Sequence, residues 1–476
     1  MSFDFDSAMR RKLGYQLIDR VDEFFSSLPH RSVQLPLEQR TYGPLSNPLP
    51  ESGEDAAKVL DDLCREMVDK GFHVPSANYF GLMNPTPTYM SFLGEALVAA
   101  LNPQLATLAR SQLASKIELE TVRWIGERVG WPGDFSGTFT SGGNEANFSG
   151  LALALVHHFP EVVEDGVLAI GAQPVLYSSS ESHHSLDKSA GLLGIGRRAL
   201  RRIAVDDQLR MDPMKLEQAI QQDRSAGKRP FCVVATAGTT NSGIVDDLST
   251  LADVCQRHQL WLHVDGAYGA AAIFSDRHRN IVRGIERADS LTIDPHKWLA
   301  VPYAAGVILT SHPEALQKAF AVNAAYMPKA AGAILPDNAR ISTQWTRRMN
   351  SLKLWLTLRV HGRQAYEELI DDQLRLAKGF ADWVRSSEDF ELAAPQVLPI
   401  VNFRVRGLQG EELTAANNAI VEEVTRDGRL YISETVARGS SAVRMMVISY
   451  LTEERHLQEL QRALVAAAQK LRLTAR

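Results

Sequence analysis

The sequence predicts an α/β protein built on a large, mostly parallel β-sheet. From about Asn84 to Ser311, short β-rich runs alternate with helical patterns. Strand–helix–strand repetition of this kind places successive strands parallel in one sheet. The residues with unusual chemistry follow these predicted strands, and ligands of such sheets bind at the carboxyl ends of the strands.

The N-terminal region, residues 1–83, is predicted to be a helical arm. Apolar residues recur at helical spacing from Ala8 to Leu28, and a second amphipathic helix is expected from Asp55 to Lys70. The stretch Pro29–Gly53 is rich in Pro, Ser and Gly and is expected to be a loop or an extended arm. Because two helices and a loop cannot bury both of their faces alone, we expect this arm to pack on a partner subunit.

Residues 84–388 are predicted to form the large α/β domain. Its predicted strands are Gly137–Thr140, Pro174–Ser178, Phe231–Ala235, Leu260–Val264, Ser290–Ile293 and Ala305–Leu309. Its predicted helices include Asn144–His158, Ser185–Leu193, Met214–Ala226 and Leu248–Gln259. Helical spacing of apolar residues across 347–388 predicts a long connector helix at the end of this domain.

Residues 389–476 are predicted to form a small α+β domain in the order β-β-helix-β-β-helix. Its strands are expected near Ile400–Val405, Leu430–Ile432 and Val443–Ile448.

Composition excludes several classes of protein. The 476 residues include 51 basic and 56 acidic side chains, a net charge of −5, whereas a nucleic-acid-binding protein would show a basic bias. No apolar run approaches the roughly 18 residues that span a bilayer, and the N-terminus lacks the apolar segment of a signal peptide. Cys64, Cys232 and Cys255 are far apart, which argues against a disulfide framework or a zinc site and fits a reducing, cytoplasmic location.

A lysine and an aspartate stand out because each directly follows a predicted strand. Lys297, in Ile293–Trp298, is either a surface lysine in a turn or a lysine that forms an imine with a carbonyl cofactor. Asp265 ends the apolar strand Leu260–Val264, where its carboxylate needs a partner. It either caps the next helix or pairs with a protonated pyridine nitrogen.

Three further turns carry polar groups that suit a phosphorylated ring. Thr140–Asn147 is a Gly-rich turn before a helix, where backbone N–H groups can bind phosphate, although such turns are common. His183 follows another strand and can stack on a ring or be satisfied by the backbone. Thr239 lies in a turn of small hydroxyl residues after Ala235. Taken together, a phosphate cradle, a ring stacker, a nitrogen partner and an imine lysine match pyridoxal 5′-phosphate (PLP).

The sequence resembles the group II PLP-dependent amino-acid decarboxylases from about His73 to the C-terminus. The motifs that carry this resemblance are D-P-H-K-W at 294–298, H-V-D-G-A-Y at 263–268, T-S-G-G-N-E-A-N at 140–147 and the histidine-containing loop at 181–185. The resemblance implies a fold type I enzyme that acts on a small amino-acid substrate, as a homodimer with active sites at the subunit interface.

The resemblance also assigns roles to individual residues. Lys297 matches the imine lysine, Asp265 the partner of the pyridine nitrogen, and His183 the stacking histidine, and these three are the predicted catalytic residues. The further predicted cofactor contacts are Ser141, Gly142, Gly143, Asn144, Thr239, Ala267, Asp294 and His296. The implied reaction is decarboxylation of an L-amino acid, aromatic or specialised, through a Lys297 aldimine and a quinonoid, with no metal ion.

One departure from the family bears on the reaction. Decarboxylases of this family usually carry a proton-donating tyrosine in a mobile loop, but the corresponding segment 327–346 has none. This favours an alternative in which oxygen intercepts the intermediate and the product is an aldehyde. Other PLP chemistry, such as aminotransfer or C–S lysis, is a second alternative, and a non-enzymatic PLP-fold protein is a third.

Three residues are candidate substrate contacts on the basis of residue type and position alone. Tyr79 and Phe80 are predicted to line an aromatic pocket, or else to belong to an interface core. Arg444 is a candidate for binding a carboxylate, with an ordinary ion pair as the alternative.

Overall fold

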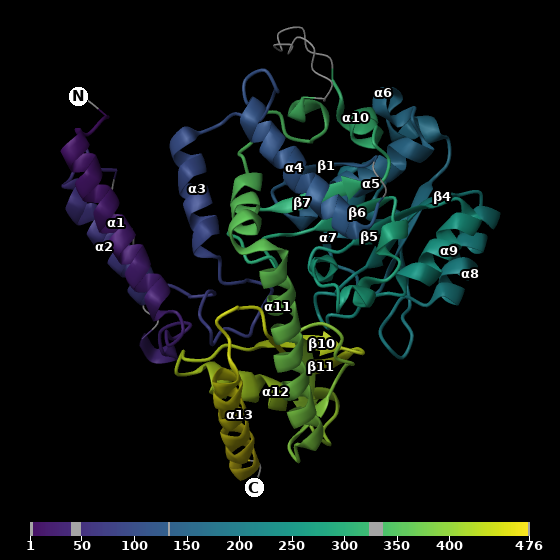
Figure 1. The fold of residues 1–476 in the computed structure, drawn as a ribbon. Coiled ribbons are helices and arrows are strands. Elements are labelled where there is room, and N and C mark those ends of the chain that lie inside the picture. Colours follow the sequence, from purple (N-terminus) through teal and green to yellow (C-terminus); the bar gives the residue numbers. More distant parts are fainter. Residues whose placement is uncertain (1–2, 40–48, 132–133, 323–336, 475–476) are drawn as a thin grey trace.

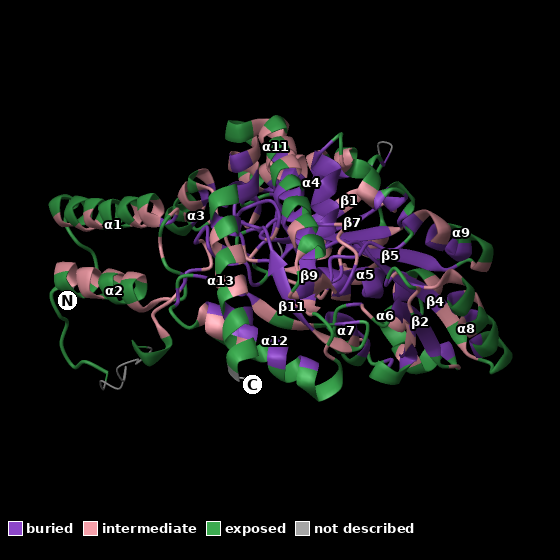
Figure 2. Ribbon diagram, turned by 90° about the horizontal axis from the view of Figure 1, so that it is seen from below, coloured by how far each residue is buried: buried purple, intermediate pink, exposed green. Residues whose placement is uncertain are grey.

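The computed structural model describes residues 3–39, 49–131, 134–322 and 337–474 (Figure 1). The chain begins with two helices, α1 (Ser7–Ser27) and α2 (Ala56–Lys70), which pack side by side and extend away from the rest of the molecule (Figures 1 and 2). Near the end of α1, the ring of Phe25 contacts Tyr89 and Phe92. Asp6 and Asp55 cap their N-termini, because each carboxylate accepts a hydrogen bond from a free backbone N–H of the first turn. Neither helix contains a buried residue.

A seven-stranded sheet forms the centre of the molecule, in the order β1-β7-β6-β5-β4-β2-β3. Its strands are β1 (Ser136–Thr140), β2 (Pro174–Ser179), β3 (Leu200–Ile203), β4 (Arg229–Thr236), β5 (Trp261–Asp265), β6 (Ser290–Ile293) and β7 (Gly306–Thr310). β7 runs antiparallel to its neighbours β1 and β6, and the other pairs are parallel. The prediction of a mostly parallel α/β sheet is therefore confirmed.

Helices pack around this sheet, some directly and others through neighbouring helices (Figure 2). They are α3 (Tyr89–Leu101), α4 (Gln112–Val129), α5 (Gly143–His158), α6 (Val162–Asp165), α7 (Ser185–Leu192), α8 (Pro213–Ser225), α9 (Leu248–His258) and α10 (Ala315–Phe320). β2, β5, β6 and β7 are buried along their whole length. Strands buried on both faces are mostly apolar, which is why they were recognisable as short apolar runs.

The six strands predicted for this sheet are all present, but β3 was missed. β3 has the sequence Leu-Arg-Arg-Ile, and only its two end residues are buried. Its position at the edge of the sheet, next to β2, leaves the two arginines partly exposed. A four-residue edge strand with two central charges has no apolar pattern to reveal it.

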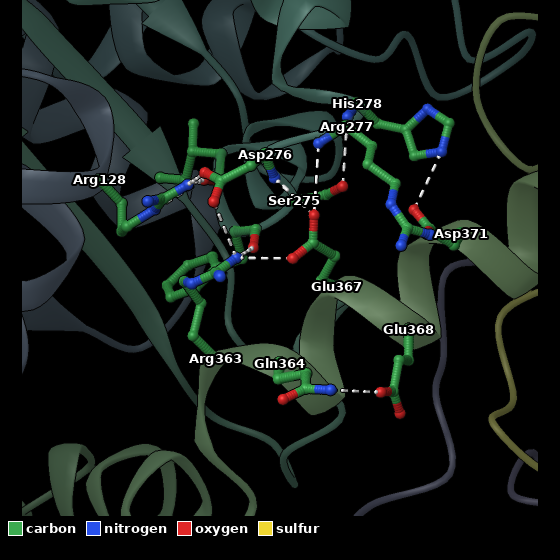
Figure 3. A network of polar contacts seen from close by, with 12 residues as sticks. Arg128, Ser275, Asp276, Arg277, His278, Arg363, Gln364, Glu367, Glu368 and Asp371 are labelled. Atoms are coloured by element: carbon green, nitrogen blue, oxygen red, sulfur yellow. Dashed lines mark hydrogen bonds and ion pairs between the residues drawn. The ribbon is translucent and has the colours of Figure 1, made fainter.

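The predicted connector helix is α11 (Ser351–Ser386), which is bent at Gly362. Gly362 has φ 72°, a left-handed conformation that favours glycine. Directly after the bend, a polar network joins α11 to residues 275–278 (Figure 3). Glu367 accepts hydrogen bonds from two backbone N–H groups there, and Asp371 pairs with His278 at 3.0 Å.

A second sheet of four strands, β10-β11-β9-β8, follows α11. Its elements are β8 (Phe390–Leu392), β9 (Ile400–Val405), α12 (Gly410–Thr425), β10 (Ser433–Ala437), β11 (Ser440–Met446) and α13 (Glu454–Thr474), so the predicted order is confirmed. The strand predicted at Leu430–Ile432 is wrong in position. Leu430 and Ile432 are buried core residues, and Tyr431 forms only an isolated bridge to Tyr79.

No helix among the described residues is long and apolar enough to cross a membrane. The same part of the chain holds no cluster of three or more His, Cys, Asp or Glu side chains suited to a metal ion.

Candidate active site

A cavity of about 320 Å³ lies at the carboxyl ends of the central strands. It brings together every predicted cofactor residue except Thr239. The residues that line it are Met83, Ser141, Gly142, Gly143, Asn144, Asn147, His183, Thr236, Gly238, Thr240, Asp265, Ala267, Tyr268, Asp294, His296 and Lys297. They come from segments far apart in the sequence, because the parallel strands end at one edge of the sheet.

Lys297 lies in the turn after β6, with its ammonium group 3.2 Å from Asp294 Oδ2. Asp294 is 2 % exposed, and its other carboxylate oxygen, Oδ1, has no hydrogen-bond partner among the residues that the structure describes. His296 lies 3.7 Å from the same Oδ2, and its Nδ1 accepts a hydrogen bond from the backbone N–H of Ala305. Burial lowers the pKa of His296, which favours the neutral ring that can accept this bond.

Asp265 ends β5 and is held by a buried chain of hydrogen bonds. Asn147 of α5 donates from Nδ2 to Asp265 Oδ2 at 2.9 Å, and its Oδ1 lies 3.1 Å from His263 Nε2. His263 Nδ1 in turn lies 2.8 Å from Ser290 Oγ. The backbone N–H of Ala267 donates to Asp265 Oδ1 at 3.2 Å. These contacts fix the carboxylate in the cavity wall, where it can pair with a cationic ring nitrogen.

The Gly-rich turn between β1 and α5 packs closely against Asp294 and Gly306. A Cβ atom at Gly143 would lie 2.6 Å from Asp294 Oδ2, and one at Gly306 would lie 2.6 Å from the Gly142 Cα atom. Side chains at these positions would therefore clash with the neighbouring loop. The first N–H groups of a helix have no partner within the helix, so the start of α5 offers donors to an anion.

His183 lies in the turn between β2 and α7, and its Nδ1 accepts a hydrogen bond from the backbone N–H of Ser185. Burial lowers the pKa of His183, so a neutral ring faces the cavity.

Thr239 is the one predicted cofactor residue that does not line the cavity. It is 1 % exposed; its hydroxyl pairs with Ser242 and also accepts a hydrogen bond from the backbone N–H of Ile244. The hydroxyl residues of this turn that do line the cavity are Thr236 and Thr240. Thr239 was predicted as a contact because its turn was recognised, but the sequence does not show which hydroxyl of a turn faces inward.

The three predicted substrate residues lie outside the cavity lining. Phe80 is fully buried in the core of the C-terminal sheet, so its prediction as a pocket residue does not fit the structure. Tyr79 stacks on Tyr431, with ring centroids 5.5 Å apart, and its hydroxyl donates to Asn84 Oδ1. Met83, from the same segment, lines the cavity instead.

Arg444 of β11 is 5 % exposed and donates to the backbone oxygen of Thr240, a lining residue, at 2.6 Å. Its guanidinium also contacts Ser433 Oγ, and among the described residues no carboxylate pairs with it. Burial lowers the pKa of this guanidinium, as expected for a cation without a counter-ion.

Sequence reasoning missed Asn147 and Tyr268 as lining residues. Both lie inside motifs that were recognised, T-S-G-G-N-E-A-N and H-V-D-G-A-Y. Asn147 is four residues after Gly143, so in α5 both residues lie on the same face of the helix. This spacing could have predicted that Asn147 lines the cavity.

The tyrosine-free segment 327–346 is described only from residue 337 onward, so the prediction of a mobile loop falls largely outside the described residues. Within the described part, Asp337 Oδ1 accepts a hydrogen bond from the backbone N–H of Leu108, and Asn338 donates to Ser115 Oγ.

The site defines a class of enzyme. A lysine beside a buried carboxylate, a second carboxylate fixed by Asn147, a neutral histidine and a glycine turn at a helix start fit PLP group by group. When bound, PLP supplies a ring that accepts the electron pair left by bond cleavage at the substrate Cα.

Comparisons with known proteins agree with this class. The family described as the pyridoxal-dependent decarboxylase conserved domain matches residues 38–406. An aromatic-L-amino-acid decarboxylase of Bacillus atrophaeus is 30 % identical over 470 residues, covering 98 % of this chain and 96 % of that protein. A phenylacetaldehyde synthase of Arabidopsis thaliana is 28 % identical, covering 95 % and 94 % of the two chains.

Solved structures show the same similarity. The crystal structure of Oryza sativa TDC with PLP and tryptamine has a TM-score of 0.92 at 25 % identity, covering 99 % of this chain and 100 % of that chain. The crystal structure of mouse CSAD has a TM-score of 0.91 at 26 % identity, covering 98 % and 99 %.

The chain therefore belongs to the pyridoxal-dependent decarboxylase family. It is a PLP-dependent carboxy-lyase that acts on an L-amino acid, as predicted from the sequence.

Proposed function

We propose that this enzyme removes the α-carboxylate of an aromatic L-amino acid and releases the corresponding amine. The observation that carries the proposal is the single cavity in which Lys297, Asp265 and His183 meet. Similarity to an aromatic-L-amino-acid decarboxylase over 98 % of the chain supports the aromatic substrate class.

In this proposal each residue has a defined task. Lys297 would hold PLP covalently, and its amine would be released when the substrate amine takes its place. Asp265 keeps the ring nitrogen protonated, because a fixed carboxylate in a buried site favours the cationic form of its partner. His183 packs against the ring, and Ser141–Asn144 bind the phosphate. Arg444 lies outside the cavity lining and donates to the backbone oxygen of Thr240, so its task is to hold this lining residue in place and not to bind the substrate directly.

A second candidate is an oxygen-dependent aldehyde synthase. The absence of tyrosine from the segment 327–346 favours it, and two similar proteins are named as aldehyde synthases, one from Arabidopsis thaliana and one from Rhodiola rosea.

Product analysis separates the two candidates. The PLP-loaded enzyme would be incubated with L-phenylalanine, L-tyrosine and L-tryptophan in air and under nitrogen, with L-glutamate as the acidic control. The proposal predicts an aromatic amine in equal yield under both gases. An aldehyde with ammonia and peroxide, formed only in air, would establish the second candidate.

We also propose that the enzyme is a homodimer and that residues 1–83 pack on the partner. Val59, Leu63 and Met67 repeat every four residues along one face of α2, and all three are exposed. An apolar stripe on a helix without buried residues indicates a missing partner surface.

Sedimentation of the full-length chain tests this assembly. The double variant Leu63→Asp, Met67→Asp should shift the protein toward the monomer, whereas Glu66→Ala on the same helix should not. A monomeric parent protein, or an unaffected dimer in the double variant, would contradict the proposal.

The three cysteines are free thiols, and Cys232 and Cys255 are buried. Free thiols are typical of a reducing compartment, and on this basis we propose a cytoplasmic location.

A further inference from the structure

The carboxylate of Glu145 joins the Gly-rich turn to Gln344, which lies 199 residues after Glu145 in the sequence. Glu145 lies in the first turn of α5, directly after the Gly-rich turn. Glu145 Oε2 accepts a hydrogen bond from the backbone N–H of Ser141 at 2.8 Å. The side chain of Gln344 donates to both carboxylate oxygens, at 3.0 and 2.8 Å, and the hydroxyl of Thr343 donates to Oε1.

The other end of the same segment is fixed beside the same turn. Arg347 forms an ion pair with Glu118 in which both side chains are 2 % exposed. Arg347 also donates to the hydroxyl of Thr138 in β1 at 3.0 Å. Residues Thr343–Arg347 are here called the strap. β1 runs directly into the Gly-rich turn, so the strap is fixed at one end to Glu145, just after this turn, and at the other end to Thr138, just before it.

The charge of Glu145 is stabilised in this position. Burial alone would raise the pKa of Glu145, but hydrogen bonds from Thr343, Ser141 and Gln344 outweigh it, and the pKa lies below its usual value. A carboxylate in the first turn also interacts favourably with the helix dipole of α5. The anchor of the strap is therefore an ionised group that contacts the backbone of the Gly-rich turn.

We propose that Glu145 is a positioning residue that couples the strap to the phosphate-binding turn, so that PLP binding and the placement of the strap stabilise each other. The inference rests on the proposed role of Ser141–Asn144 in binding phosphate. A phosphate that fixes the backbone of Ser141 also fixes the carboxylate that receives Thr343 and Gln344. Because such coupling is reciprocal, loosening the strap must weaken PLP binding by the same factor.

Gln344→Ala is the most direct variant, because it removes two hydrogen bonds to Glu145 from a partly exposed position outside the cavity. The dissociation constant of PLP should rise by about fivefold or more, the low end of ordinary coupling between sites. Gln104→Ala is the matched control. Gln104 contacts the strap at Thr346, 3.4 Å away, and no hydrogen bond joins it to Glu145. Its variant should bind PLP like the parent.

Hydrogen exchange provides a readout that a purely structural role would not change. In the parent protein, saturation with PLP should slow the exchange of backbone amides in the peptide covering 341–349. In Glu145→Gln and Gln344→Ala, each saturated with PLP, this slowing should be lost. Equal slowing in parent and variants, no slowing in the parent, or an equal loss of affinity in Gln104→Ala would overturn the coupling. Failure of the parent protein to bind PLP at all would instead contradict the proposed function.

Discussion

Asn147 donates a hydrogen bond from Nδ2 to Asp265 Oδ2 across 2.9 Å, and thereby joins the helix that follows the Gly-rich turn to the carboxylate at the end of β5. Both side chains are buried. The proposed phosphate site and the proposed partner of the ring nitrogen are thus linked by a direct, buried contact. A flat, phosphorylated ring in the cavity would therefore contact two groups that are joined by one buried hydrogen bond.

Asn147→Leu should reduce kcat by about 10- to 100-fold, since hydrogen bonds to charged groups contribute about 1.5–3 kcal/mol. The lost bond leaves Asp265 free to turn away from the ring nitrogen.

Asp265→Ala should retain some bound PLP with far lower activity. The measurements are kcat and bound PLP for each variant, and parental kcat in Asp265→Ala would remove its proposed role.

Lys297→Ala should abolish turnover, because both the covalent attachment of PLP and product release depend on this amine. Reduction with borohydride followed by mass spectrometry checks the attachment. The parent protein should gain the mass of reduced PLP on the peptide containing Lys297, and the variant should gain none. Turnover at the parental rate in Lys297→Ala would show that this site is wrongly assigned.

Gln373 of α11 is expected to hold the lysine turn in place. It accepts a hydrogen bond from the indole N–H of Trp298 at 2.6 Å and donates to the backbone oxygen of Ile448 at 2.9 Å. Gln373→Leu leaves both buried groups unpaired, at a cost of about 1–3 kcal/mol each. Urea unfolding should show this loss, together with a lower kcat.

Gln364→Ala is the matched control for this variant. Gln364 lies exposed on the same helix and contacts Glu368 (Figure 3). Its substitution should change the free energy of unfolding by less than about 0.5 kcal/mol. An equal effect of both substitutions would show that the contact with Trp298 has no special importance.

His263 should make the protein sensitive to acid. Burial lowers its pKa from 6.5 to about 4, so the folded state keeps the ring neutral while the unfolded chain binds a proton. The free energy of unfolding should therefore not change with this titration above pH 6.5. As the pH falls from 6.5 toward 4, it should fall by about 3 kcal/mol in total.

The test compares His263→Asn with the parent in urea at several pH values. The variant should be less stable at pH 7, and the difference should shrink as the pH falls from 6.5 to 4. A comparison with the parent is needed because Asp246 acts in the opposite sense. Burial raises the pKa of Asp246 to about 6, so its contribution falls as the pH rises from about 4 to 6. A difference that stays constant with pH would contradict the prediction for His263.

The central sheet and most of the site were predictable because they depend on local signals. Buried parallel strands are short apolar runs, and the residues after them, such as Asp265 and Lys297, are chemically conspicuous. Contacts that depend on the backbone conformation of individual residues in a turn were not predictable. Thr239 and Thr240 are adjacent residues of the same type, and only the backbone conformation decides that Thr240 lines the cavity.

Substrate contacts were predicted least well, for a related reason. Phe80 and Met83 are both apolar and three residues apart, so composition does not separate a core residue from a lining residue. Phe80 is buried because the segment 79–81 pairs with Tyr431 and Met446 of the C-terminal region, with Phe80 in backbone hydrogen bonds to both. That long-range pairing has no signature in the local sequence.

The release of CO2 from carboxyl-labelled L-amino acids is the measurement that tests the central claim most directly. The PLP-loaded enzyme would receive L-phenylalanine, L-tyrosine, L-tryptophan and L-glutamate, each labelled with ¹³C in the α-carboxylate, and Lys297→Ala would serve as the blank. The account predicts labelled CO2 from at least one aromatic substrate, and none from the Lys297→Ala protein. A product that retains the labelled carboxylate, as in aminotransfer or C–S lysis, would contradict it.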